Sequence, residues 1–246
     1  MRYKFTNNFP EINVYKKQSK YSEIVSQIVL GQSFVVLKKT KKWLKIRIQD
    51  DGYKGFIVNK KYPNKVDTTH KISILKANIY KEANKKKKIG FLTFGSRIRA
   101  ELKKNGFIKF DKKWIENKNL KPNNYREKNI FQNLSIFKGV KYKWGGKSYK
   151  GIDCSALVQI FFNFNNKYCP RDASKQVKYF RKNIDLKNIK KNDIIYWKGH
   201  VAIAISKSKL IHAYGPFKKT IIMNIQNTIK RIKNTANLDV IAIKRI

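Results

Sequence analysis

The sequence predicts two small β-domains followed by an α+β domain, and three observations lead to that prediction. Residues 12–62 consist of short apolar or alternating runs separated by turn residues, which is typical of small barrels. Residues 72–116 repeat the same plan. From about residue 125 onwards, apolar residues first recur at helical spacing and then gather in strand-like runs, which favours an α+β domain.

The individual elements follow this division. Gly31 stands twelve residues before Trp43 and Gly95 stands twelve before Phe107, so the two repeats should share strands and turns. The polar stretch 117–124 contains a proline and is predicted to be a linker. The expected strands are 28–30, 34–37, 43–48, 201–205, 210–214 and 240–243, and the expected helices are 130–137 and 154–164. The predicted domains are therefore 1–67, 68–122 and 123–246, with one larger β-domain as the alternative for the first two.

Composition limits the class of protein and its partners. The 246 residues include 41% hydrophobic and 13% aromatic residues, which excludes wholesale disorder. A formal charge of +42 attracts polyanions such as nucleic acid, anionic lipid or anionic wall polymer. Because the lysines are spread along the whole chain, we expect a generally basic surface, with a dedicated polyanion site as the alternative.

The sequence also bears on location. The longest apolar stretches, such as 201–205, are far too short to span a bilayer. The first thirty residues show no secretory apolar segment, so we expect a cytoplasmic protein; a chain that begins after processing is the alternative.

Cys154 is the first candidate for chemistry. It follows Gly151 and stands at the expected start of a helix, where free N–H groups stabilise a thiolate. Thiols placed this way titrate at about 3.5–7.5 rather than about 8.5. The alternative is a small buried residue without chemistry. Two cysteines make no disulfide framework, and we interpret Cys169 as a buried thiol.

Two of the three histidines lie close together in the sequence. A hairpin centred near Ser206 would set His200 across from His212 on the same face of a sheet. One imidazole could then orient the other, which would exchange a proton with a thiol. Two surface histidines or a two-ligand metal site are the alternatives, and spacing alone does not decide among them.

Several motifs in the last 120 residues resemble the NlpC-type cell-wall cysteine peptidases, which are papain-like enzymes. They occur in the family's order: GVKYKWGG at 139–146, DCSALVQ at 153–159, PRDASKQ at 170–176, NDIIYW at 192–197, GHVAI at 199–203 and LIHA at 210–213. The N-terminal repeats resemble bacterial SH3-like domains. This combination is similar to the γ-D-glutamyl-L-diamino acid endopeptidases. Ala156, Lys141 and Asn192 depart from the family pattern without removing a functional group.

The resemblance implies roles for particular residues. Cys154 would be the nucleophile, His200 the proton carrier and His212 the residue that orients His200. The backbone N–H of Cys154 would hold the oxyanion, together with the Tyr142 hydroxyl. The implied reaction is hydrolysis of the γ-D-Glu–L-diamino acid bond (diaminopimelate or Lys) in murein peptides, without cofactor or metal.

The resemblance also implies how the substrate is bound. Asp153 and Ser155 would receive the free amine of the first L-Ala, although Asp153 as a helix cap and Ser155 as an ordinary first-turn residue are alternatives. Tyr53 would close the pocket from the first SH3-like domain, or else pack locally in its turn. Trp144 would form a wall of the pocket or part of the core.

The resulting expectation is a monomer that acts on murein peptide, with neither nucleic acid nor membrane as a specific partner. Two other functions stay open: a non-catalytic module that binds cell wall or polyanions, and a related thiol amidase or acyltransferase. The first function would not require that Cys154, His200 and His212 are all present. The second would use the same residues with a different acceptor.

Overall fold

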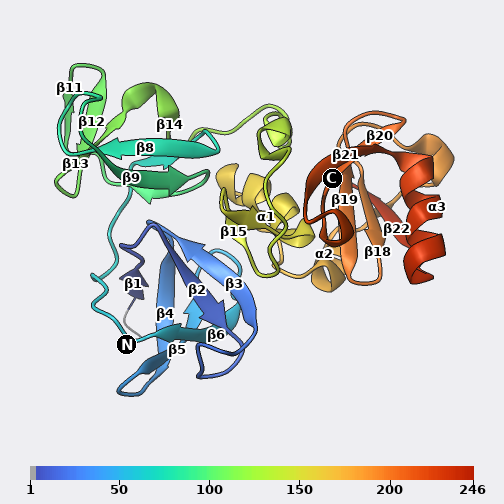
Figure 1. Ribbon diagram of the computed structural model, residues 1–246, viewed down its shortest axis with the longest axis horizontal. Helices are drawn as coiled ribbons and strands as arrows, with labels where there is room; N and C mark the ends of the chain where they lie inside the picture. The colour runs from blue at the N-terminus through green and yellow to red at the C-terminus, as the bar shows by residue number, and fades with distance from the viewer. Residues whose placement is uncertain (1–3) are drawn as a thin grey trace.

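The computed structural model describes residues 4–246, so residues 1–3, which open the first predicted domain, lie outside the described part. Two β-domains precede a C-terminal α+β domain (Figure 1). The first β-domain contains β1 (Lys4–Thr6), β2 (Glu11–Tyr15), β3 (Ile24–Val29), β4 (Ser33–Lys39), β5 (Trp43–Ile48) and β6 (Lys54–Val58). These strands form one antiparallel sheet in the order β1-β4-β5-β6-β2-β3.

Alternation along β5 explains the core of this sheet. Leu44, Ile46 and Ile48 are buried, whereas Lys45 is exposed and Arg47 is partly exposed. Successive strand residues point to opposite faces, so this pattern places every second side chain inside. The inner face closes over a core that also contains Val14, Ile28, Phe34, Ile57 and Tyr62.

The second β-domain has its own buried core. Its strands are β7 (His70–Ile72), β8 (Lys76–Tyr80), β9 (Lys88–Thr93), β10 (Arg97–Ile98), β11 (Leu102–Lys104), β12 (Phe107–Phe110), β13 (Lys113–Glu116) and β14 (Leu120–Pro122). They form two sheets, β10-β7-β14 and β11-β12-β13-β8-β9. The prediction of a linker at 117–124 is wrong in part, because β14 pairs with β7 and Leu120 is buried in the core. That this domain is a second SH3-like barrel stays a prediction.

Gly31 lies where the two β-domains meet. Its φ of +81° falls in the region that glycine tolerates best, and a Cβ atom there would collide with the backbone carbonyl of Arg97. The Arg97 amide donates to the carbonyl of Leu30 at 2.8 Å. The predicted turn glycine therefore also permits close contact between the domains.

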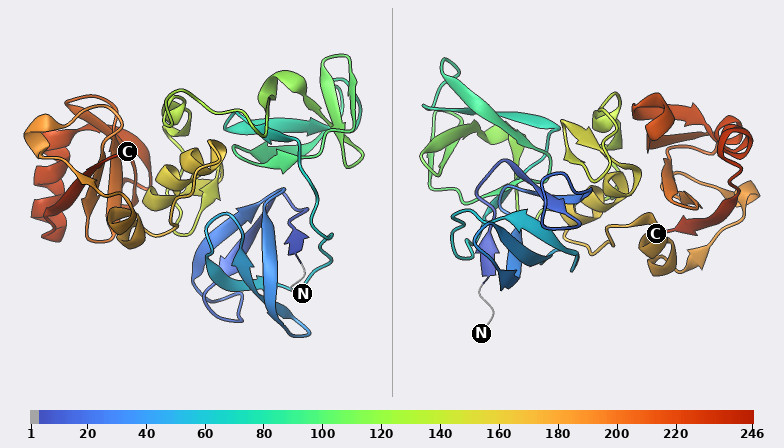
Figure 2. Two further views of the ribbon diagram at one scale, coloured as in Figure 1. Left: turned by 180° about the vertical axis from the view of Figure 1, so that it is seen from behind. Right: turned by 60° about the horizontal axis from the view of Figure 1, so that its bottom comes forward.

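The C-terminal domain is built around a six-stranded sheet in the order β17-β22-β18-β19-β20-β21. Its strands are β17 (Lys182–Asn183), β18 (Ile194–Trp197), β19 (His200–Ala204), β20 (Lys209–Tyr214), β21 (Lys219–Asn224) and β22 (Val240–Arg245); a small hairpin, β15 (Lys147–Ser148) and β16 (Gly151–Ile152), precedes them. The helices are α1 (Cys154–Phe164), α2 (Ala173–Tyr179) and α3 (Ile225–Ala236). α1 lies between the sheet and the two β-domains, and α3 covers the opposite face of the sheet (Figures 1 and 2).

The sequence patterns gave mixed results in this domain. The helix predicted at 154–164 coincides with α1, and the three predicted strands overlap β19, β20 and β22. The helix predicted at 130–137 is wrong, since only a short 3-10 helix, Leu134–Phe137, forms there. β18, β21 and α3 lie outside the predicted elements.

Candidate active site

Cys154 is the first residue of α1, directly after the N-cap residue Asp153. The Asp153 carboxylate accepts from the backbone N–H of Ala156 at 2.8 Å, so the cap alternative describes Asp153 correctly. Cys154 is only 5% exposed, and the backbone N–H groups of Val201 and Ser155 lie close enough to act on the pKa of its thiol, in the downward direction. The start of α1 therefore faces the start of β19, next to His200.

The two imidazoles meet as the hairpin predicts. His200 Nε2 and His212 Nδ1 are 2.8 Å apart. The pairing of Ile203 with Ile211 sets a register in which His212 lies level with Ala202, so the two histidines face each other diagonally rather than directly. The Tyr214 ring stacks on His212 with centroids 4.5 Å apart and planes at 12°. The hydrogen bond and the stacking together restrict the orientation of both rings.

Burial sets the protonation of these groups. It raises the pKa of the Cys154 thiol to about 12, and the charge of Asp153 acts in the same direction. Burial lowers the pKa of His200 to about 4; burial and then His200 lower that of His212 to about 2. The predicted low thiol pKa is therefore wrong, because desolvation outweighs the field of the helix N-terminus. At neutral pH the resting site holds a thiol and two neutral imidazoles.

A testable consequence concerns alkylation. We expect iodoacetamide to modify Cys154 slowly at pH 6 and faster as the pH rises towards 9, because only the thiolate reacts. Cys169 should react more slowly still, since it is 0% exposed and burial also raises its pKa. Mass spectrometry of peptides after timed alkylation measures both rates. An alkylation rate of Cys154 that is already maximal at pH 6 would contradict a resting site with a neutral thiol and neutral imidazoles.

Protonation should also make stability depend on pH. The unfolded chain binds a proton on His212 below about pH 6.5, whereas the folded chain does not until about pH 2. Lowering the pH from 7 to 4.5 should therefore decrease the free energy of unfolding by roughly 2–3 kcal/mol through the titration of His212 alone. Urea denaturation at the two pH values, with wild type and His212→Asn, measures the difference. An equal pH dependence of stability in both proteins would contradict the lowered pKa of His212.

Arg171 was missed as a site residue, although the motif at 170–176 contains it. It is 3% exposed and makes a two-point ion pair with Asp153, with the Arg171 Nη1–Asp153 Oδ1 contact at 3.0 Å. The same guanidinium donates to Ser155 Oγ at 2.9 Å and to Ser26 Oγ of the first β-domain at 3.1 Å. The backbone N–H of Gly145 donates to the other Asp153 oxygen at 2.9 Å. The charge of Asp153 is thus already compensated within the protein.

The first β-domain brings Tyr53 to the site. The Asp51 carboxylate accepts from the Tyr53 N–H and from Gln159 Nε2 of α1, both at 2.9 Å, which anchors this loop on the C-terminal domain. Burial and then the charge of Asp172 raise the pKa of the Tyr53 hydroxyl to about 12. Asp172 is the N-cap residue of α2, and its side chain is 35% exposed. Tyr53 and Asp172 therefore form a polar corner between the domains.

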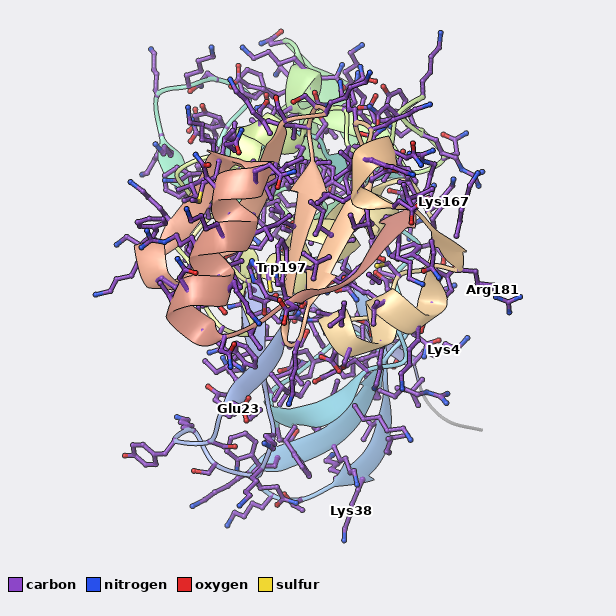
Figure 3. All side chains as sticks on the ribbon, turned by 90° about the vertical axis from the view of Figure 1, so that its right-hand side faces the viewer. Lys4, Glu23, Lys38, Lys167, Arg181 and Trp197 are labelled. Atoms are coloured by element: carbon purple, nitrogen blue, oxygen red, sulfur yellow. The ribbon has the colours of Figure 1, made fainter. Side chains whose placement is uncertain are left out.

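A second loop of the first β-domain contacts Trp144. The Trp144 side chain is 56% exposed, and its Nε1 donates to Glu23 at 2.8 Å. Figure 3 shows Glu23 at the border between the first β-domain and the C-terminal domain. Glu23 is a second residue that the sequence did not single out. Trp144 therefore belongs to an exposed wall rather than to the core.

Tyr142 lies near the nucleophile. It is half-buried, and burial followed by the neighbouring Cys154 raises its pKa, so its hydroxyl stays protonated and can donate a hydrogen bond. Trp197, in contrast, is 1% exposed, and its ring centroid lies 5.6 Å from that of His200, so it packs against the histidine as part of the core.

Within residues 4–246, no three His, Cys, Asp or Glu side chains are grouped so that they could hold a metal ion. None of the helices in the described chain is long and apolar enough to cross a bilayer.

Comparison with known families assigns the two parts that surround this site. Residues 139–235 match the NlpC/P60 family, and residues 10–63 match the bacterial SH3 domain. The C-terminal domain therefore belongs to the NlpC/P60 family of peptidases, and a bacterial SH3 domain precedes it in the chain.

Among characterised proteins, the chain is 27% identical to the gamma-D-glutamyl-L-lysine dipeptidyl-peptidase of Bacillus subtilis, over 84% of this chain and 77% of that protein. It is 31% identical to the murein DD-endopeptidase MepS/murein LD-carboxypeptidase of Escherichia coli K12, over 34% of this chain and 47% of that protein. The crystal structure of an NlpC/P60 family protein from Bacillus cereus shares the fold with a TM-score of 0.83 at 16% identity, over 98% of this chain and 99% of that one.

Proposed function

We propose that this chain is a cysteine peptidase that hydrolyses the bond between γ-D-Glu and the diamino acid of murein peptides with a free N-terminal L-Ala. The observation that carries the proposal is the polar corner of Tyr53 and Asp172, because Asp172 directly follows Arg171, which pairs with Asp153 next to Cys154. A partly exposed carboxylate next to a protonated phenol suits an ammonium group. The name of the Bacillus subtilis relative supports the same bond class.

The Cys154 thiol and the His200 imidazole are both neutral in the resting site, and this suggests the sequence of proton transfers. The Cys154 thiol attacks the γ-carbonyl carbon of D-Glu while its proton passes to His200. The backbone N–H of Cys154 and the Tyr142 hydroxyl stabilise the oxyanion. The diamino acid leaves with the proton from His200, and a thioester to Cys154 remains. Water then loses a proton to His200 and hydrolyses the thioester, while His212 keeps the His200 ring in place.

The geometry changes one part of the binding scheme. Asp153 already holds Arg171, so a substrate ammonium would have to compete with a buried guanidinium for it. We therefore place the L-Ala amine at Asp172 and Tyr53. Asp153 and Ser155 keep a supporting role, because they position Arg171 across the domain boundary to Ser26. Trp144 forms the exposed wall on the side of Glu23.

The direct test uses defined peptides. We expect L-Ala-γ-D-Glu-L-Lys and its diaminopimelate counterpart to yield the dipeptide L-Ala-γ-D-Glu, read by mass spectrometry. Cleavage at another bond, or transfer of the acyl group to an added amine as the main product, would replace this proposal with the amidase or acyltransferase alternative. Because released peptides carry the free amine, we place the enzyme in the recycling of murein peptides.

A further inference from the structure

A basic groove runs between the second β-domain and the peptidase domain, outside the catalytic residues. It is shallow, with a volume of about 570 Å³. Its lining residues are Leu75, Lys138, Gly139, Val140, Lys141, Tyr149 and Lys150. Lys76, Lys88 and Phe91 extend it across β8 and β9, and we call the whole surface the lysine–aromatic groove.

The two rings in this groove hold lysine ammonium groups. The Phe91 and Tyr149 centroids are 6.0 Å apart. Lys76 Nζ lies 3.7 Å from the Phe91 centroid and 4.9 Å from that of Tyr149. Lys88 Nζ lies 4.4 Å from Phe91, and Lys150 Nζ lies 5.9 Å from Tyr149. Cation–π contacts of this kind orient the ammonium groups without neutralising them.

The charge of the groove is almost uncompensated. All five of its lysines are exposed: Lys76, Lys88, Lys138, Lys141 and Lys150. In the described part of the chain, none of the seven residues that line the 570 Å³ hollow is acidic. Within residues 4–246, the only ion pair that involves one of these lysines joins Lys150 to Glu11 at 3.0 Å. Although lysines cover the whole protein, this surface combines them with a groove and with rings that hold their positions.

A hydrogen bond also joins the two domains at the groove. The backbone N–H of Tyr149, which follows β15, donates to Thr93 Oγ1 of β9 at 3.0 Å. Figure 1 shows β9 beside β15. This hydrogen bond ties together the two domains that supply the lysines, and such a connection reduces the entropy lost when a chain of anions binds.

We propose that the lysine–aromatic groove binds a linear polymer of phosphodiester-linked polyols. Regularly spaced phosphates match several cations in a row, and release of their counterions supplies the affinity. Single-stranded nucleic acid fits less well, because each ring already carries two ammonium groups where a base would stack. This binding does not depend on which peptide bond the enzyme cuts.

The test compares two variants of equal net charge. Lys76→Gln/Lys88→Gln/Lys138→Gln removes three groove lysines, and Lys198→Gln/Lys207→Gln/Lys230→Gln removes three exposed lysines elsewhere. Fluorescence titration with a labelled glycerol-phosphate decamer at several salt concentrations gives the affinity and its salt slope. We expect the groove variant to bind at least about tenfold more weakly and to lower the slope by about 2, whereas the control variant binds like wild type. Unchanged hydrolysis of the murein peptide shows that both variants are folded.

Two results would overturn the proposal. Equal losses in the two variants would mean that only the general positive field of the protein attracts the polymer. Tighter binding of a thymidine decanucleotide of matched charge than of the glycerol-phosphate decamer would assign the groove to single-stranded nucleic acid instead.

Discussion

Replacing Cys154 with alanine is expected to abolish peptide hydrolysis, with a loss of at least about four powers of ten in kcat. No other thiol can take its place, because Cys169 is completely buried and lies outside the contact of the two histidines. The measurement is the rate of dipeptide release from L-Ala-γ-D-Glu-L-Lys. The alanine removes one small buried side chain, so the fold should persist.

Cys169→Ala is the matched control for this experiment. It removes the other cysteine and should keep nearly full activity, while circular dichroism and thermal unfolding show that both variants are folded. Turnover by Cys154→Ala near the wild-type rate would rule out covalent catalysis by this thiol. Loss of activity in both variants, with intact folds, would point to a general effect of the substitutions.

Acetylation of the substrate's L-Ala amine should produce the second large effect. The acetyl group removes the positive charge of the substrate amine, which we expect Asp172 to bind. It also adds atoms beside Tyr53. Loss of a charge-assisted contact in a partly enclosed site should lower kcat/KM by roughly two to three powers of ten. Parallel assays with free and acetylated L-Ala-γ-D-Glu-L-Lys measure this ratio. Intact peptidoglycan, whose L-Ala is amide-linked, should resist cleavage for the same reason.

Asp172→Asn separates the amine pocket from a purely steric effect. It keeps the shape of the side chain but removes the charge, so it should slow cleavage of the free peptide and leave the acetylated one nearly unchanged. Lys178→Gln is the control, because Lys178 is an exposed residue of the same helix and its substitution also removes one charge. Equal kcat/KM on the two peptides with the wild-type enzyme would refute the amine pocket and favour action on intact wall.

The sequence alone determined the features that local patterns encode. The helix after Asp153 was predictable because an N-cap residue and an apolar run act within a few residues of each other. The contact of His200 with His212 was predictable because a short hairpin brings neighbouring strands together. The alternating strand β5 followed from its residue period of two.

Local patterns failed where distant segments supply the partner. The composition of the stretch 117–124 predicts a linker. In the folded chain, however, Leu120 pairs with β7, about fifty residues earlier in the sequence. The segment 130–137 has helical spacing, yet it packs its apolar side chains on α1 and forms only a short 3-10 helix. Propensity is a weak guide in such segments, since tertiary packing overrides it.

Only the tertiary structure decided the electrostatics of the site. A thiol at a helix start suggests a low pKa, but the folded protein buries Cys154 and its pKa rises. Asp153 suggested an ammonium ligand, but Arg171 reaches it from eighteen residues away and compensates its charge. The SH3 domain then places Tyr53 beside Asp172. Burial and charge pairing depend on how separate domains pack together, so residue types and their spacing could not reveal them.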